Sequence, residues 1–130
     1  MTESKDQVQE VFPTGGSVPW SDHSACFFCA VDPAGAAGHV RQSLKPDGSW
    51  MTIEPMAGDK LEDNLNSVGR IYYADSTMEC VPTSLSQEVG AALGAQAGEA
   101  RLREVITAGG FRNVRRAAET PLNMILEARP

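Results

Sequence analysis

Residues 25–54 carry the pattern that most constrains the fold. Residues 25–31 (ACFFCAV) form an apolar run without alternation, which is typical of a strand buried on both faces of a parallel sheet. Asp32 and Pro33 follow as an N-cap and a first-turn proline, and the next apolar residues recur at helical spacing. Residues 49–54 have the pattern of another strand. The order strand, helix, strand predicts a right-handed βαβ unit and hence an α/β fold.

The middle of the chain, residues 56–97, predicts a helical insertion over one end of the sheet. Residues 59–73 mix polar and apolar residues with helical tendency, and Pro82 interrupts the pattern. Ser84 begins a capping box, S-L-S-Q, in front of an alanine-rich run that predicts a further helix over residues 89–97. Close helix packing is the expected role of three glycines spaced four residues apart, Gly90, Gly94 and Gly98.

The last third of the chain has the clearest local signals. Residues 99–108 are amphipathic, and Glu99 stands four residues before Arg103, the favourable order for a helical ion pair. Residues 111–119 and 122–128 then predict two short strands that pair antiparallel. Together the segments predict a partial Rossmann-like sheet of about four strands, the last one antiparallel, with helices and a helical insertion.

Composition allows one domain and argues against several classes of partner. We expect residues 1–24, broken by proline and glycine, to be poorly ordered, and residues 25–130 to form the domain. The net charge of −6 argues against nucleic acid, and the densest basic run is expected on a solvated strand edge: Arg112, Arg115 and Arg116. No apolar run reaches the ~20 residues that span a bilayer, and the polar N-terminus lacks a secretory signal. Three cysteines give no disulfide framework, so a reduced, cytoplasmic setting is expected.

Two segments resemble the second half of a class I S-adenosylmethionine-dependent methyltransferase. HVRQSLKPDGSWMTIEP, beginning at His39, is similar to the helix, turn and fifth strand of that fold. LREVITAGGFRNVRRAAETPLNMILEARP, beginning at Leu102, resembles its final helix and the two strands that close the sheet. The residues between them are similar to the substrate-side insertion of a bacterial subgroup in which a winged-helix region precedes the methyltransferase domain. The resemblance implies S-adenosylmethionine as the methyl donor.

The sequence departs from this family where the cofactor would bind. The family uses a D-x-G-x-G-type loop after the first strand and an acidic residue that ends the second, and neither has a counterpart here. Gly15 and Gly16 lie in a proline-broken segment with no apolar strand before them. Residues 29–33 follow Phe28 directly, where the subgroup has a segment bearing Asp and His. No cofactor-binding residue is therefore assigned.

Five residues are candidates for binding the methyl acceptor. Glu54 ends a predicted strand, and residues at the carboxyl ends of parallel strands face the ligand crevice, although it can equally cap the following loop. The resemblance places Asn64, Arg70, Tyr72 and Tyr73 around an acceptor pocket, in which the phenols would orient a planar substrate. The alternative is that one tyrosine packs on the sheet while the other is exposed. No catalytic residue is assigned.

We expect no metal site. Cys26 and Cys29 match a C-x-x-C spacing, but residues three apart on a strand point to opposite faces, so buried structural cysteines are expected. Cys80, His23 and His39 show no ligand spacing, and His39 is expected as a partly exposed helical residue. An acidic cluster can take a cation or simply begin a solvated helix: Asp59, Glu62 and Asp63.

Two functions of different class follow. In the first, the chain is a methyltransferase component, inactive alone, whose cofactor half comes from another polypeptide or from a symmetry mate through an exposed sheet edge. In the second, it is a non-catalytic remnant that self-associates or binds a partner. A shortened sheet leaves a strand edge and apolar flanks uncovered, and such surfaces tend to dimerise.

Overall fold

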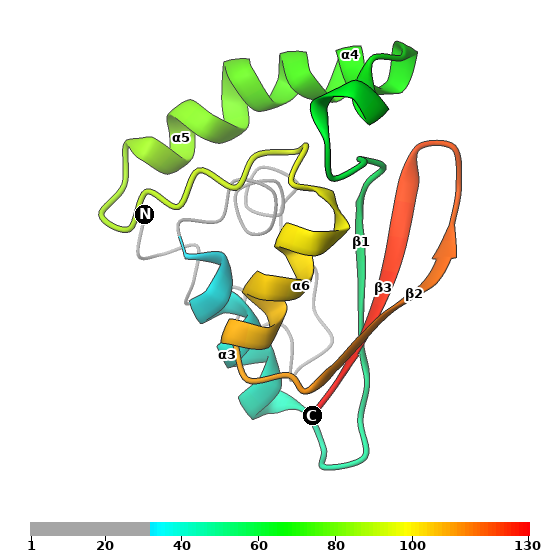
Figure 1. The fold of residues 1–130 in the computed structure, drawn as a ribbon. Helices are drawn as coiled ribbons and strands as arrows, with labels where there is room; N and C mark the ends of the chain where they lie inside the picture. The colour runs from blue at the N-terminus through cyan, green and yellow to red at the C-terminus, as the bar shows by residue number, and fades with distance from the viewer. Residues whose placement is uncertain (1–31) are drawn as a thin grey trace, which may run out of the picture.

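The computed structural model describes residues 32–130, which form an α/β arrangement with one three-stranded sheet. The strands are β1 (Trp50–Pro55), β2 (Asn113–Glu119) and β3 (Asn123–Arg129), in the spatial order β1-β3-β2 (Figure 1). Both pairings are antiparallel, so the predicted pairing of the last two strands is confirmed. The last strand therefore lies between two strands that run in the same direction as each other. The predicted strand at residues 25–31 lies outside the described residues, as do all calls on residues 1–24.

Two helices cover one face of this sheet. α3 (Pro33–Ser43) begins where the sequence predicts, because the Asp32 carboxylate accepts a 2.8 Å hydrogen bond from the amide of Gly35. α6 (Gly98–Ala108) packs against α3, and Figure 1 shows the two helices on the same side of the sheet. The amphipathic helix predicted in the last third of the chain is thus confirmed.

The core lies between this helix pair and the sheet. Met124 and Leu126 of β3 have no exposed surface, and the antiparallel register places them opposite Glu54 and Thr52 of β1. Directly opposed residues share one face of a sheet, so Thr52 and Glu54 point to the buried side. Side chains from both helices and from the segment before β2 complete the core: Ala37, Leu102, Ile106 and Phe111.

A helical arm, residues 67–85, begins at the end of the sheet where β1 finishes and extends from there past α6, away from the sheet (Figure 1). It consists of α4 (Ser67–Asp75), the π-helical turn η2 (Ser76–Cys80) and α5 (Val81–Leu85) without a break between them. A short 3₁₀ turn, η1 (Leu61–Asn64), precedes it. The predicted helical insertion is present, and its first helix, α4, lies at one end of the sheet.

The prediction that Pro82 interrupts the insertion is wrong. Pro82 occupies the first turn of α5, and the helix continues through it. Proline normally disrupts a helix because its ring meets the carbonyl four residues earlier and because it lacks an N–H group. Here that earlier carbonyl, of Met78, belongs to the wider π-helical turn, where hydrogen bonds span five residues.

The predicted helix over residues 89–97 is also wrong. Residues 86–97 have no helical structure, and three glycines adopt left-handed backbone conformations, with φ of +57° at Gly90, +70° at Gly94 and +75° at Gly98. The four-residue glycine spacing therefore serves backbone turns and not helix packing. Ser84 does not cap a following helix, because its Oγ accepts a 2.9 Å hydrogen bond from the amide of Ala92.

The basic residues lie along an edge of the sheet, as predicted. β2 is an edge strand of the three-stranded sheet, and Arg115 pairs across it with Glu127 of β3. Arg116 joins β2 to α6 through Glu99, which also binds Arg103 at the predicted four-residue spacing. Arg103, Arg115 and Arg116 are thus each paired with a glutamate of the same chain. Across residues 32–130, no helix is long and apolar enough to cross a bilayer.

Candidate functional site

Glu54 is buried at the carboxyl end of β1, where the sequence placed a candidate site residue. Its side chain points to the helix-covered face and is 5% exposed. The Thr52 hydroxyl donates a 2.8 Å hydrogen bond to Oε1 of Glu54. Burial raises the pKa of Glu54 from 4.5 to about 7, and the hydrogen bond from Thr52 opposes that rise. The carboxyl group can thus hold or release a proton near neutral pH, which is the property that acid–base chemistry requires.

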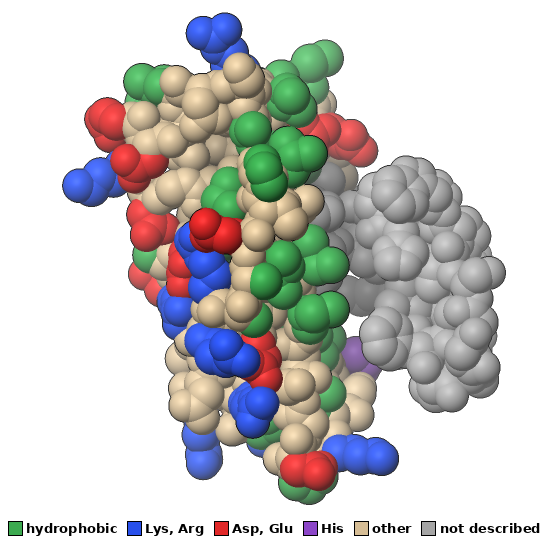
Figure 2. Space-filling model, turned by 90° about the vertical axis from the view of Figure 1, so that its right-hand side faces the viewer, with side chains coloured by type: hydrophobic (Ala, Val, Ile, Leu, Met, Phe, Trp, Pro, Cys, Tyr) green, Lys and Arg blue, Asp and Glu red, His purple; other side chains and the backbone are tan. Residues whose placement is uncertain are grey.

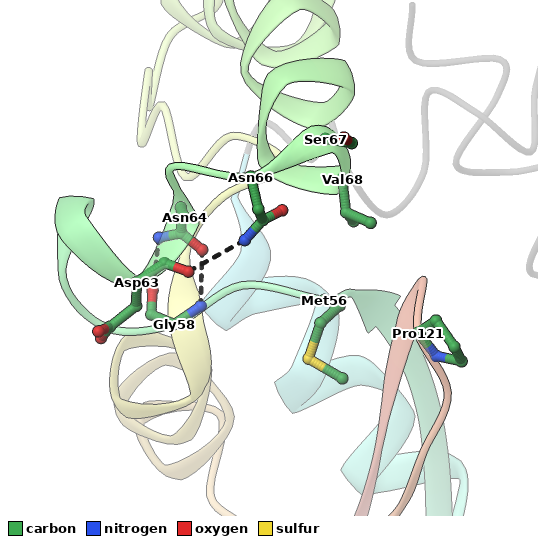
Figure 3. A pocket seen from close by; sticks show the side chains of 8 residues that line it. All are labelled: Met56, Gly58, Asp63, Asn64, Asn66, Ser67, Val68 and Pro121. Carbon is green, nitrogen blue, oxygen red and sulfur yellow. Dashed lines mark hydrogen bonds between the residues drawn. The ribbon is translucent and has the colours of Figure 1, made fainter.

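A hollow of about 450 Å³ lies where the end of β1, the start of the helical arm and the β2–β3 turn meet. Figure 3 shows that its wall combines a short loop with the first residues of α4. The lining is mixed polar and apolar: Met56, Gly58, Asp63, Asn64, Asn66, Ser67, Val68 and Pro121. Met56 is two residues beyond Glu54, so β1 leads from the buried carboxyl group to this hollow.

Asn64 lines the hollow, but its amide is already committed to the loop beside it. Its Oδ1 accepts a 2.8 Å hydrogen bond from the amide of Gly58, and its Nδ2 donates to the Gly58 carbonyl (Figure 3). The same Nδ2 also donates to the carbonyl of Lys60. Asn66 caps α4 by accepting a 2.8 Å hydrogen bond from the amide of Gly69. Both asparagines therefore shape the wall by holding backbone groups in place.

The tyrosine segment lies apart from the hollow. The Tyr72 hydroxyl donates a 2.9 Å hydrogen bond to the carbonyl of Leu122, which attaches the helical arm to the β2–β3 turn. The ring of Tyr72 packs on the small apolar cluster of Cys80 and Ala95. Tyr73 is half-buried and Arg70 is exposed, and neither lines the hollow. The structure thus brings one of the four insertion candidates, Asn64, to the cavity.

Two residues of this region were missed at the level of sequence. Thr52 had a usable signal, because residues two apart on a strand share a face and Thr52 must accompany Glu54. Gln96 had no sequence signal. Both polar atoms of its amide are buried without a hydrogen-bond partner among residues 32–130. Its neighbour Ala97 packs on the main core, so the loop before α6 brings an unsatisfied polar group against the interior.

A carboxylate occupies the start of α6, and the described residues include no cluster of metal ligands. Within residues 32–130, no cluster of His, Cys, Asp and Glu could hold a metal ion. Of the acidic residues, Asp59 instead accepts a 2.8 Å hydrogen bond from the amide of Ala100 in the first turn of α6. That turn follows the glycine-containing loop, and a Cβ atom on Gly98 would lie 2.6 Å from Oδ1 of Asp59. A carboxylate thus occupies the helix start at which an anionic ligand would bind.

The cysteine and histidine predictions can be followed only in part. Cys80 is buried, and His39 is exposed on α3. Cys26, Cys29 and His23 lie outside the described residues. No family model and no curated protein matches the chain.

Proposed function

We propose that the chain is a component of a class I S-adenosylmethionine-dependent methyltransferase-like protein, that it carries the methyl-acceptor side of the site, and that it is inactive alone. The observation that carries the proposal is the buried, proton-holding Glu54 at the carboxyl end of β1. Ligands of open α/β sheets bind at such strand ends. The resemblance of the segments around β1, α6, β2 and β3 supplies the family.

The arrangement of the strands supports this proposal. β3 is antiparallel to both of its neighbours, as the resemblance implies for the last strand. Among the described residues β1 pairs with β3 alone, so its second edge is open to a further strand. In the proposal, the apolar run at residues 25–31 supplies a fourth strand at this edge, parallel to β1. Another polypeptide or a symmetry mate would supply the donor side.

The chain's own contribution would be to position and deprotonate the acceptor. Glu54 can accept a hydrogen bond or a proton from an acceptor group held at the end of β1, since burial brings its pKa to about 7. The hollow that begins at Met56 would hold the rest of the acceptor beside the end of β1. No step through S-adenosylmethionine is assigned to the described residues. The helix that begins with a glycine, α6, already has the Asp59 carboxylate bound at its first turn.

Two measurements test the proposal. Nuclear Overhauser contacts between residues 25–31 and β1 should report a parallel strand pair, and their absence would contradict the methyltransferase-like sheet. Calorimetric titration with S-adenosylmethionine should show no saturable binding to the monomer. Micromolar binding by the monomer would overturn the claim that it lacks a donor site. Binding confined to a dimer would assign the donor side to the second copy.

A second candidate function is a non-catalytic, self-associating or partner-binding remnant. It is favoured by the apolar side chains on the sheet face opposite to α3 and α6, where Met51 is 65% exposed and Ile53 is 52% exposed. Figure 2 shows hydrophobic side chains gathered on this side of the molecule. A dimer that binds no S-adenosylmethionine would favour this candidate, and saturable binding in any oligomeric state would exclude it.

A further inference from the structure

One backbone carbonyl, that of Leu122, joins the three parts of the chain that surround the hollow. It accepts a 2.8 Å hydrogen bond from the amide of Met56, the first residue after β1. It also accepts the 2.9 Å hydrogen bond from the Tyr72 hydroxyl of α4. A carbonyl oxygen has two lone pairs, so both bonds form together. The end of β1, the β2–β3 turn and α4 therefore meet at Leu122.

The same three parts supply the apolar side chains of the hollow. Met56 follows β1, Val68 lies in the first turn of α4, and Pro121 belongs to the β2–β3 turn (Figure 3). Val68 and Tyr72 are four residues apart and share a face of α4, and Leu122 is the neighbour of Pro121. Tyr72 does not line the hollow, but its hydrogen bond holds two walls of the hollow together.

Apart from this bond, the helical arm packs mainly on itself and on the loop that follows it. The small apolar cluster of Cys80 and Ala95, on which Tyr72 packs, is formed by the arm and this loop. The loop also reaches the main core through Leu93 and Ala97. Among the described residues, the side chains of the main core include none from the arm. An element that buries so little apolar surface against the core opens at a low cost in free energy.

We propose that the Tyr72–Leu122 hydrogen bond is a latch that holds α4 against the β2–β3 turn, and that the hollow binds its occupant only while this latch is closed. Tyr72 is thus a positioning residue. The inference rests on the proposed function, because the occupant would be the methyl acceptor beside the end of β1. The bond is exposed to solvent, so water can replace the carbonyl as the partner of the phenol when α4 opens. The start of α4 stays fixed, because Asn66 caps it by accepting from the amide of Gly69.

Closure of the latch and occupation of the hollow are then coupled. An occupant that touches Met56, Val68 and Pro121 together loses its contact with Val68 when α4 opens. A ligand at about ten times its Kd that binds only the closed form lowers the population of the open form about elevenfold. The amide of Asn64 is already used within its own loop, so the occupant meets mainly apolar side chains. A suitable probe is 4-fluorobenzyl alcohol, a neutral aromatic ring with one hydroxyl group.

Native-state hydrogen exchange of the full chain at a series of low urea concentrations tests the opening of α4. Amides of α4 should show a smaller urea dependence than those of β3, because opening of the arm exposes less surface than unfolding of the domain. Tyr72→Phe should speed up the exchange of both sets of amides about fivefold, since the native state loses one hydrogen bond that neither the open nor the unfolded form has. Tyr73→Phe is the matched control and should leave both sets unchanged.

The probe supplies the second measurement, with its Kd taken from the shift of the Met56 methyl signal. At about ten times that Kd, the exchange of both sets of amides should slow about elevenfold. The latch is overturned if α4 and β3 show the same urea dependence, or if β3 alone responds to Tyr72→Phe or to the probe. A Met56 signal that does not respond up to the solubility limit of the probe would overturn the hollow as a binding site. None of these results depends on S-adenosylmethionine or on residues 25–31, so the methyltransferase proposal is tested separately.

Discussion

The hydroxyl of Thr52 donates a 2.8 Å hydrogen bond to Oε1 of Glu54, two residues along β1 on the buried face of the sheet. This bond favours the ionised carboxylate, while burial favours the protonated form more strongly. The result is an acid with a pKa of about 7 next to the core residue Met124.

Replacement of Glu54 by Gln should remove a pH dependence of folding. In the unfolded chain the pKa of Glu54 is 4.5, and in the folded chain it is about 7, so the folded state binds more protons between these values. The stabilisation is complete below pH 4.5 and is lost as the pH rises to 7. The difference corresponds to about 3 kcal/mol. We expect Glu54→Gln to be more stable than the wild type at pH 8, and by up to this amount.

Urea unfolding at a series of pH values measures this effect. The free-energy difference between Glu54→Gln and the wild type should grow from pH 4.5 to pH 7 and then stay constant. Glu88→Gln is the matched control, because Glu88 is exposed, and its difference from the wild type should stay nearly flat. Parallel pH profiles for Glu54→Gln and the wild type would show that Glu54 does not titrate near neutrality.

The attachment of the helical arm to the β2–β3 turn gives a second prediction. Tyr72→Phe removes the hydroxyl that donates to the carbonyl of Leu122 and should reduce the free energy of unfolding by about 1 kcal/mol. Amide hydrogen exchange in the arm should speed up with it. Tyr73→Phe is the matched control, because the Tyr73 hydroxyl makes no hydrogen bond with the described residues and should be nearly neutral. If both variants lose stability equally, the bond to Leu122 does not hold the arm.

The helices α3 and α6 could be predicted because the residues that define them are neighbours in the sequence. Asp32 followed by Pro33 defines the start of α3 within the sequence itself, and the Glu99–Arg103 spacing on an amphipathic pattern identifies α6. The hairpin of β2 and β3 could be predicted from two short strand patterns joined by a turn. Long-range order was a different matter, because the placement of β3 between β1 and β2 depends on residues about 70 positions apart.

The predictions failed where side chains far away in the sequence bind backbone groups that would otherwise form local hydrogen bonds. Alanine-rich residues 89–97 favour a helix by propensity, but Ser76 and Ser84 bind the amides of Ala95 and Ala92 and hold the loop open. In the candidate site, the strand-end position of Glu54 could be predicted, and its burial could not. The partner of Tyr72 lies 50 residues away in sequence, so no pattern in the insertion revealed its structural role.

The left-handed backbone at Gly98 gives the last prediction. Gly98 has φ of +75°, and a Cβ there would lie 2.6 Å from Oδ1 and 3.1 Å from the Cα of Asp59. Gly98→Ala should therefore cost about 1–2 kcal/mol in backbone strain. Displacement of Asp59 from the amide of Ala100 should cost about 1 kcal/mol more.

Gly38→Ala is the matched control, because Gly38 lies inside α3 with its nearest Cβ contact at 3.6 Å. It should stabilise the fold by about 0.4–1 kcal/mol, since alanine lowers the entropy of the unfolded chain. Urea unfolding of both variants measures the two changes in the free energy of unfolding. If both changes have the same sign, the left-handed conformation does not distinguish Gly98 from Gly38.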